Sequence, residues 1–246
     1  MAPTIPVKEP ELGYGGGGAH PPITDGGDGG GGRDNGSPDY GGRLRRTRLG
    51  LLIGLASITM VFVALTSAYV VRRGLPSLDE KTSTYVRDWM PVNLPTGLLL
   101  VNTFLLLLSS VTAELARRQI ARQAALAPVQ SIPGVSIGVE GRFPWLGVTV
   151  VLGLGFLSGQ WMAWQALADR GFYVASNPGS SFVYLLTAAH AVHLTGGILA
   201  LMYAGITALL KKPIEARRIV VDIAVWYWHF MALLWIYIFA LLEFMR

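Results

Sequence analysis

The side chains of this sequence that could take part in chemistry are a few ionisable residues set in long apolar runs. His190 and His193 lie three positions apart in one run, and His229 lies in another, within the segment Trp226–His229. Imidazole is a common ligand of haem iron, and three imidazoles can hold copper or zinc. Residues three apart share one face of a helix and cannot bind one haem from opposite sides, so such a site would need His229 beside them.

A structural interpretation of the histidines is simpler. Polar side chains in membrane bundles hydrogen-bond to neighbouring helices. Nothing in the spacing brings His229 to His190 and His193, and the sequence has no cysteine that could complete a thiolate site. We therefore predict that the three histidines bond to neighbouring helices and that the chain supplies no metal or cofactor ligand.

Two acidic residues lie near the ends of apolar runs. Glu114 precedes Arg117 and Arg118, which predicts a cluster that is ion-paired or solvated at the membrane surface. Asp222 stands where the fifth run begins and is predicted to cap a helix, because carboxylates favour helix N-termini. A lipid headgroup or a buried base are its alternative partners. The sequence has no paired-carboxylate site, nucleophile elbow or phosphate loop, so we predict no catalytic residue.

The elements that must position these residues are membrane-spanning helices. Charged residues make up 14% of the chain, whereas soluble domains carry about 25%. A helix needs about 20 apolar residues to cross the hydrocarbon core. The predicted fold is an all-α integral membrane protein with a bundle of five transmembrane helices, and the five runs are Leu49–Val71, Thr96–Ala113, Phe143–Ala168, Ser180–Leu210 and Ile223–Leu242.

The first 42 residues differ from the rest in composition. They hold the glycine runs Gly15–Gly18 and Gly29–Gly32 and few apolar side chains, which is typical of a disordered tail. We predict such a tail over residues 1–42 and a membrane domain over residues 43–246. No predicted strand precedes the glycines and no helix follows them, so they do not read as a phosphate-binding loop.

The placement of charge predicts topology rather than nucleic-acid binding. The net charge is +5, but the basic residues flank the apolar runs instead of forming one groove. Outside the tail, twelve lysines and arginines would lie on the cytoplasmic side and six on the other if the N-terminus is inside. This bias predicts a multi-pass protein of the plasma membrane with a cytoplasmic N-terminus and an external C-terminus.

The connections carry their own signals. Residues 74–95 are predicted to form an external connection, with a short interfacial helix near Tyr85–Met90 and Trp89 as a surface anchor. Gln119–Arg142 is predicted to be an irregular loop, and Asn177–Gly179 a turn between the third and fourth helices.

Small residues predict that the helices pack closely, as a compact bundle or against a partner, because the approach of backbones drives association in lipid. They are Gly147, Gly153, Gly155, Ser158, Gly159, Gly196 and Gly197. Near the outer end of the third helix, Trp161, Trp164 and Gln165 suit the aromatic belt at the membrane surface.

Several of these segments resemble one family. Ala224–Phe230 reads A-V-W-Y-W-H-F, similar to the W-Y-W-H-F core in the last helix of subunit III of cytochrome c and quinol oxidases. Thr187–Gly196 reads T-A-A-H-A-V-H-L-T-G and resembles the histidine motif of that family's penultimate helix. Asn102–Thr112, Gln160 and Ala56-Ser57 are similar to motifs of three further helices, and the resemblance covers residues 48–246.

The resemblance implies a metal-free accessory subunit in a short five-helix form. Haem and copper would lie in partner subunits, and the expected partners are oxidase subunits I and II and membrane lipids, including a structural phospholipid. The whole complex would carry electrons to oxygen and pump protons. The residues that the resemblance singles out, as structural or lipid-contact positions, are Asn102, Thr112, Gln160, His190, His193, Asp222, Trp226, Trp228 and His229.

The sequence departs from the family at three acidic positions. Ile58, Ala163 and Ala232 stand where the family carries or often carries an acid, so no proton-uptake role is predicted for them. Asp222 falls where the family has glutamate. Two alternatives stay open: an accessory protein of a nitric oxide reductase, with the same fold, and a small cytochrome or transporter that acts alone.

Overall fold

The computed structural model describes residues 40–79, 84–86, 89, 92–130, 144–210 and 213–244. All of them belong to one compact unit, Asp39–Arg246. This part of the chain contains five long helices, each long and apolar enough to cross a membrane, which confirms the predicted fold class. They are α1 (Tyr40–Gly74), α2 (Thr96–Gln130), α3 (Trp145–Asp169), α4 (Pro178–Leu209) and α5 (Ile214–Phe244). The predicted tail falls outside the described residues up to 39, whereas residues 40–42 are already helical.

The helices are longer than the apolar runs that predict them. At 1.5 Å per residue, the 35 residues of α1 and of α2 reach well beyond a hydrocarbon core of about 30 Å. The arginines expected before the first helix therefore lie within α1. The loop predicted from Gln119 is helical as far as Gln130, and residues 131–143 lie outside the described part. Strong helix formers explain this extension, since Arg, Gln, Ala and Leu dominate residues 117–126.

The break between α3 and α4 is built as the sequence suggested. Asn177 caps α4, because its Oδ1 accepts a hydrogen bond of 2.9 Å from the backbone N–H of Ser180. Pro178 follows at the first helical position, where its missing N–H costs nothing. Gly171 takes a φ of 82° in the preceding turn, a conformation that favours glycine.

The connection after α1 is a short hairpin, not a helix. β1 (Ser77–Asp79) pairs antiparallel with β2 (Thr84–Val86), with Ser77 opposite Val86. The predicted interfacial helix near Tyr85–Met90 is therefore wrong at Tyr85 and Val86, because β-branched and aromatic residues favour a strand there. Trp89 is half-buried, and its ring lies edge-on to Tyr69 of α1 at 5.3 Å between centroids.

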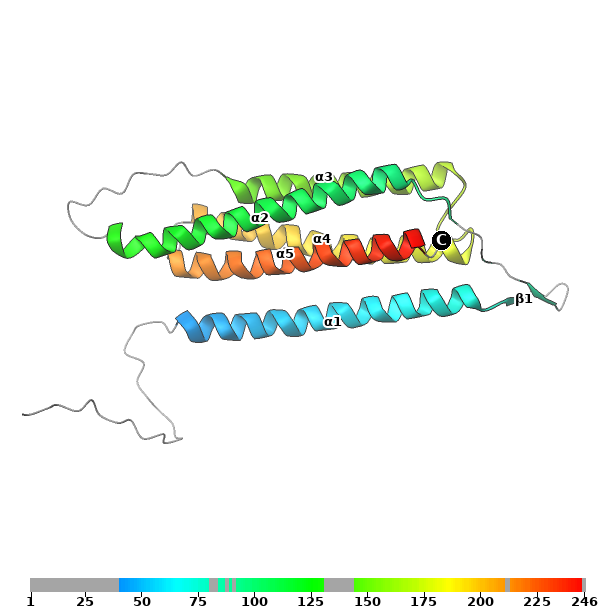
Figure 1. The fold of residues 1–246 in the computed structure, drawn as a ribbon, viewed down its shortest axis with the longest axis horizontal. Coiled ribbons are helices and arrows are strands. Elements are labelled where there is room, and N and C mark those ends of the chain that lie inside the picture. The colour runs from blue at the N-terminus through cyan, green and yellow to red at the C-terminus, as the bar shows by residue number, and fades with distance from the viewer. Residues whose placement is uncertain are drawn as a thin grey trace, which may run out of the picture. The chain divides into compact units, whose positions relative to one another are not determined.

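The helices form a four-helix group with α1 at its side (Figure 1). Within the described residues, α2 packs against α3 and α5, α4 packs against α3 and α5, and α1 contacts only α4 and α5. The core lies among α2–α5. Its largest fully buried apolar side chains include Phe156, Leu186, Leu194, Trp228 and Trp235, with Phe62 as the contribution of α1.

Three of the small residues bring helices together as predicted. A Cβ at Gly153 would lie 2.7 Å from the Trp228 ring, and one at Gly197 would lie 3.0 Å from the Tyr227 ring. A Cβ at Gly159 would overlap the side-chain amide of Asn102, at 2.8 Å from its Cγ. Gly147, Gly155, Ser158 and Gly196 face open space or make no closer than ordinary contacts within the described residues, so packing against a partner stays a prediction for them.

Candidate functional site

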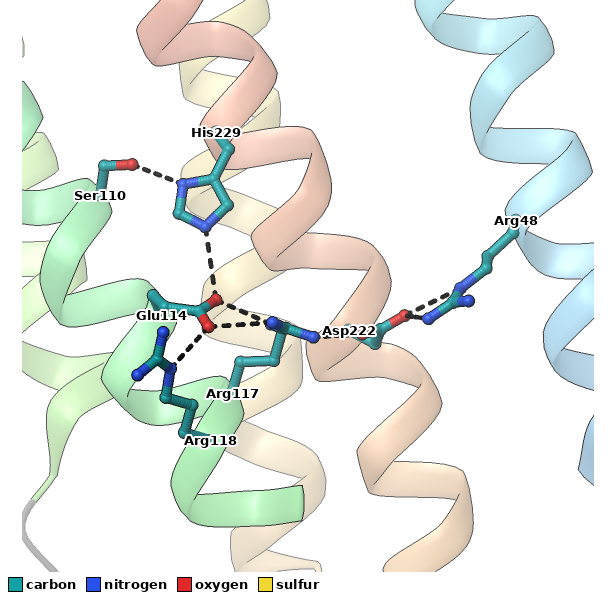
Figure 2. A network of polar contacts seen from close by, with 7 residues as sticks. All are labelled: Arg48, Ser110, Glu114, Arg117, Arg118, Asp222 and His229. Atoms are coloured by element: carbon teal, nitrogen blue, oxygen red, sulfur yellow. Dashed lines mark hydrogen bonds and ion pairs between the residues drawn. The ribbon is translucent and has the colours of Figure 1, made fainter. Parts of the chain in front are cut away.

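A charged cluster links α1, α2 and α5 near one end of the helices (Figure 2). Glu114 lies at its centre on α2. Arg117 donates two hydrogen bonds to it, from Nε to Oε2 at 2.8 Å and from Nη2 to Oε1 at 2.9 Å. Arg118 donates a third, from Nε to Oε1 at 2.8 Å. The predicted ion-paired cluster at Glu114 is confirmed, and paired N–H donors of this kind are the strong form of such contacts.

Asp222 extends the cluster from α5 to α1. The prediction that Asp222 caps α5 is wrong, because the helix begins at Ile214 and Asp222 lies two turns inside it. Its Oδ2 accepts hydrogen bonds from Arg48 Nε at 3.1 Å and from Arg48 Nη2 at 2.8 Å. Its Oδ1 lies 3.4 Å from Arg117 Nη1. The alternative of a base as partner is therefore correct, but the base is not buried, since the Arg48 side chain is 48% exposed against 10% for Asp222. The ion pair satisfies this largely buried carboxylate.

His229 completes the cluster on the side that faces α2. Its Nδ1 shares a short hydrogen bond with the hydroxyl of Ser110. Its Nε2 lies 3.7 Å from Glu114 Oε2 (Figure 2). The prediction that this histidine bonds to a neighbouring helix is confirmed.

His190 has quite different surroundings. It is fully buried, and neither ring nitrogen has a hydrogen-bond partner among the described residues. Its ring lies against Phe156 of α3, at 5.9 Å, and Trp235 of α5, at 5.2 Å between centroids. The prediction that it bonds to a neighbouring helix is wrong, because two aromatic rings lie against it where polar partners were expected.

Within the described part of the chain, the side chain of His193 also lacks the predicted bond to another helix. Its Nδ1 lies 2.7 Å from the carbonyl oxygen of Ala189, one turn earlier in α4. Its ring faces Phe62 of α1, edge-on at 5.8 Å. The link to α5 runs instead through the backbone, since the Tyr227 hydroxyl donates to the His193 carbonyl at 2.9 Å.

The three histidines do not assemble into a metal site. His229 bonds to α2, His190 lies against the rings of Phe156 and Trp235, and His193 bonds to its own helix. Within the described ranges, no group of three or more His, Cys, Asp or Glu side chains could hold a metal ion. These residues therefore do not fit a haem or copper centre, and no chemistry is assigned to them through one.

Buried tryptophans of α5 bond to hydroxyl groups of α2. Trp228 Nε1 donates to Ser109 Oγ at 3.0 Å, and Trp235 Nε1 donates to Thr103 Oγ1 at 3.0 Å. Each bond satisfies an indole N–H that burial would otherwise leave unpaired. Trp226, two positions before Trp228, is 52% exposed and turns away from this interface.

The remaining residues singled out from the sequence lie between α2 and α3 or within α3. Thr112 Oγ1 lies 2.9 Å from Thr149 Oγ1 and so ties α2 to α3. Asn102 and Gln160 are both buried, and Asn102 Nδ2 and Gln160 Oε1 have no hydrogen-bond partner in the described part of the chain. Trp164, for which the surface belt stays a prediction, donates to Thr187 of α4 at 3.0 Å.

The three positions at which this sequence has an apolar residue in place of the acid expected from the resemblance are packed in the fold. Ala163 and Ala232 are buried, and Ile58 is half-buried against the core.

Sequence reasoning missed four functional partners: Thr103, Ser109, Ser110 and the pairing of Arg48. A signal was present for three of them. Thr103, Ser109 and Ser110 are hydroxyl residues within an apolar helix, where such side chains commonly bond to a neighbouring helix. Arg48 had no such signal beyond its place directly before an apolar run, because its partner lies 174 positions away in sequence.

Several relatives of this chain are similar to it over most of its length. It is 25% identical over 201 residues to the probable cytochrome c oxidase subunit 3 of Nocardia farcinica, covering 80% of this chain and 87% of the relative. It is 27% identical to cytochrome c oxidase subunit 3 of Thermostichus vulcanus, covering 79% and 85%. It is 29% identical to quinol oxidase subunit 3 of Bacillus spizizenii, covering 78% and 83%.

The family model for cytochrome c oxidase subunit III matches residues 43–245. That range holds all but the first residues of α1 and the whole of α2–α5, with both histidine segments and the charged cluster. This chain belongs to the cytochrome c oxidase subunit III family.

Proposed function

We propose that this chain, as the accessory subunit III of a haem–copper terminal oxidase, packs in the membrane beside subunits I and II. The observation that carries this proposal is the match of the family model across all five helices. The histidines support an accessory role for the chain, because their contacts are with rings, a hydroxyl and a carboxylate of the fold itself. The partner subunits would hold the haem and copper.

The chain's own contribution would be structural. The tryptophan–hydroxyl bonds between α5 and α2 and the close glycine contacts build a rigid four-helix unit. Such a unit suits a protein that supports a catalytic neighbour in the membrane. Long exposed apolar faces on every helix would contact lipid and the partner subunits, and we include a structural phospholipid among these contacts.

We further propose a location in the plasma membrane, with the N-terminal tail on the cytoplasmic side and the C-terminus outside. The support is the gathering of arginines at one end of the bundle, where α1 begins, α2 ends and α5 begins (Figure 1). In this orientation residues 1–42 would be a cytoplasmic tail that precedes the membrane domain.

Affinity purification from gently solubilised membranes tests the partner proposal. A tag on the C-terminus should recover the large haem-bearing subunit and subunit II, identified by mass spectrometry of the intact assembly. Recovery of the tagged chain alone would contradict the proposal. The alternatives of a nitric oxide reductase partner or a solitary cytochrome are not favoured, because the family model and the relatives described above belong to oxidases.

A further inference from the structure

Three polar side chains are buried among α2–α5 without a full set of hydrogen bonds. They are Asn102 of α2, Gln160 of α3 and His190 of α4, which are 2%, 3% and 0% exposed. Asn102 Nδ2, Gln160 Oε1 and both ring nitrogens of His190 have no hydrogen-bond partner in the described part of the chain. Native proteins pair nearly all of their buried polar groups, because an unpaired one is costly. These atoms therefore point to a ligand that forms hydrogen bonds.

Gln160 and His190 lie at nearly the same level of the contact between α3 and α4. The two helices run in opposite directions (Figure 1). The ring of Phe156, one turn before Gln160, lies 5.9 Å from the ring of His190. Trp164, one turn after Gln160, donates a hydrogen bond to Thr187 at 3.0 Å. Since Thr187 lies one turn before His190, the glutamine and the histidine fall between these two contacts.

Asn102 reaches the same level from α2. A Cβ at Gly159 would lie 2.8 Å from Asn102 Cγ, so the amide lies against α3 one residue before the glutamine. The next residue of α2, Thr103, accepts a hydrogen bond of 3.0 Å from Trp235 of α5. The ring of Trp235 lies 5.2 Å from that of His190. Asn102, Gln160 and His190 thus form one polar layer across the four-helix group.

The unpaired atoms of the polar layer are complementary in kind. The Nδ2 group of Asn102 donates, the Oε1 atom of Gln160 accepts, and a neutral imidazole donates from one nitrogen and accepts at the other. They do not pair with each other directly. A water molecule both donates and accepts, and buried waters typically form about three hydrogen bonds to otherwise unpaired groups. One water molecule therefore matches the three side chains.

A departure of this sequence from its family lies beside the polar layer. Ala163 is buried, and it lies one turn after Gln160 on the same face of α3. It stands where the family carries an acid. Compared with an acidic side chain, alanine frees the volume of a carboxyl group and removes two oxygens that could bond to the layer. A water molecule restores both the volume and the hydrogen bonds.

We propose that the polar layer binds a buried water molecule, which takes the place of the carboxyl group that Ala163 lacks. The water accepts a hydrogen bond from Asn102, donates one to Gln160 and bonds to one ring nitrogen of His190. It ties α2, α3 and α4 together, and it keeps two partners if the histidine ring is replaced. This inference concerns the interior of the chain and does not depend on the identity of the partner subunits.

X-ray radiolytic footprinting of the tagged full-length chain, in the assembly in which it is purified, tests the proposal. Brief irradiation makes hydroxyl radicals from water, and a bound water oxidises the side chains beside it even where bulk solvent does not reach. Phe156 and Trp235 lie against the polar layer, whereas Phe62 and Trp228 are equally buried away from it. We expect several-fold more oxidation of Phe156 than of Phe62, and of Trp235 than of Trp228. Equal oxidation within each pair would overturn the proposal.

Replacement of the acceptor places the water in this layer. Gln160→Leu supplies an apolar side chain of similar length, so the oxidation of Phe156 and Trp235 should fall to that of the matched buried rings. Gln165→Leu is the control, because it makes the same change on the exposed side of α3. Oxidation that is as strong in Gln160→Leu as in Gln165→Leu would refute the site. A disturbed fold is recognised separately, since it would raise the oxidation of the matched rings as well.

Replacement of Ala163 tests the origin of the site without removing any of its polar groups. Ala163→Glu restores the acid of the family, and Ala163→Gln places a neutral side chain of the same size there. Either side chain should occupy the space of the water and lower the oxidation of Phe156 and Trp235. Unchanged oxidation in a variant that keeps its fold would contradict the proposal that the water replaces a carboxyl group.

Discussion

α1 and α5 are both transmembrane helices of more than 30 residues, but the fold holds them in different ways. In the most apolar 18-residue stretch, 50% of α5 is buried, against 6% of α1. α5 is fixed by tryptophans that fill the core and bond to α2. α1 is held at separate points, by the Arg48–Asp222 ion pair and by ring contacts of Phe62 and Tyr69. The comparison teaches that burial positions α5, whereas a few specific contacts position α1.

The largest effect is expected from removing a core anchor of α5. Trp228→Ala leaves a cavity beside Gly153 and removes the bond to Ser109, which should destabilise the fold by about 3 kcal/mol, the lower end of the range for buried tryptophan in soluble cores. The lower end applies because lipid tails solvate an apolar side chain as well as the core does. Trp226→Ala, at an exposed ring two positions away, is the control and should change little. Thermal unfolding of the detergent-solubilised chain measures both.

Crowding at a helix contact should have the next largest effect. Gly159→Ala places a methyl group against the Asn102 amide and should cost about 1–3 kcal/mol, because the buried side chain has little room to move. Gly155→Ala is the matched control on the same helix, since its Cβ would face open space. Alanine should be neutral or slightly stabilising there because it favours helix. Equal melting temperatures for the two variants would show that the α2–α3 contact is not close.

A smaller effect is expected at the charged cluster, and it should appear in α1 rather than in α5. Asp222→Asn removes the ion pair to Arg48, worth about 1 kcal/mol for a contact with one partner half-exposed. The chain has no cysteine, so single introduced cysteines can carry spin labels at chosen sites on α1, α4 and α5. We expect a broader α1–α4 distance distribution and an unchanged α4–α5 one. Glu215→Gln, in the exposed first turn of α5, is the control. Broadening of both distances would mean that Asp222 supports the whole bundle.

The smallest effect is expected at the most buried histidine. His190→Leu loses no hydrogen bond to any described residue and should change stability by less than about 1 kcal/mol, because removal of an unpaired buried polar group offsets the altered packing. His229→Leu, by contrast, breaks the bond to Ser110 and should cost about 1–2 kcal/mol. Chemical denaturation in detergent compares the two. A larger loss for His190→Leu would indicate a polar partner for that ring in the assembled complex.

The predictions from sequence succeeded where a local property decides the structure. The five spans follow from apolar runs matched to the bilayer, and the start of α4 follows from Asn177 and Pro178. They failed at helix ends, since α1 and α2 continue through charged residues that were expected to lie outside them. Charged residues end the membrane-spanning part of a helix but not the helix itself, which accounts for the error.

Side-chain partners were less predictable than spans. Glu114 was placed correctly because its arginines lie three and four positions away on the same helix. The environment of His190 could not be read in this way, since Phe156 and Trp235 come from two other helices. For Asp222 the sequence left three alternatives open, namely a helix cap, a lipid headgroup or a base. It could not choose between them because the partner, Arg48, comes from another helix.

The sequence by itself determined that this chain crosses the membrane five times, because crossing depends on about 20 consecutive residues and the thickness of the hydrocarbon core. Only the tertiary structure decided that Arg48 of α1 meets Asp222 of α5 and that His190 lies against the rings of Phe156 and Trp235. The physical reason is that these contacts depend on the rotation of each helix about its axis. Packing among all the helices sets that rotation, and no single segment of the sequence contains it.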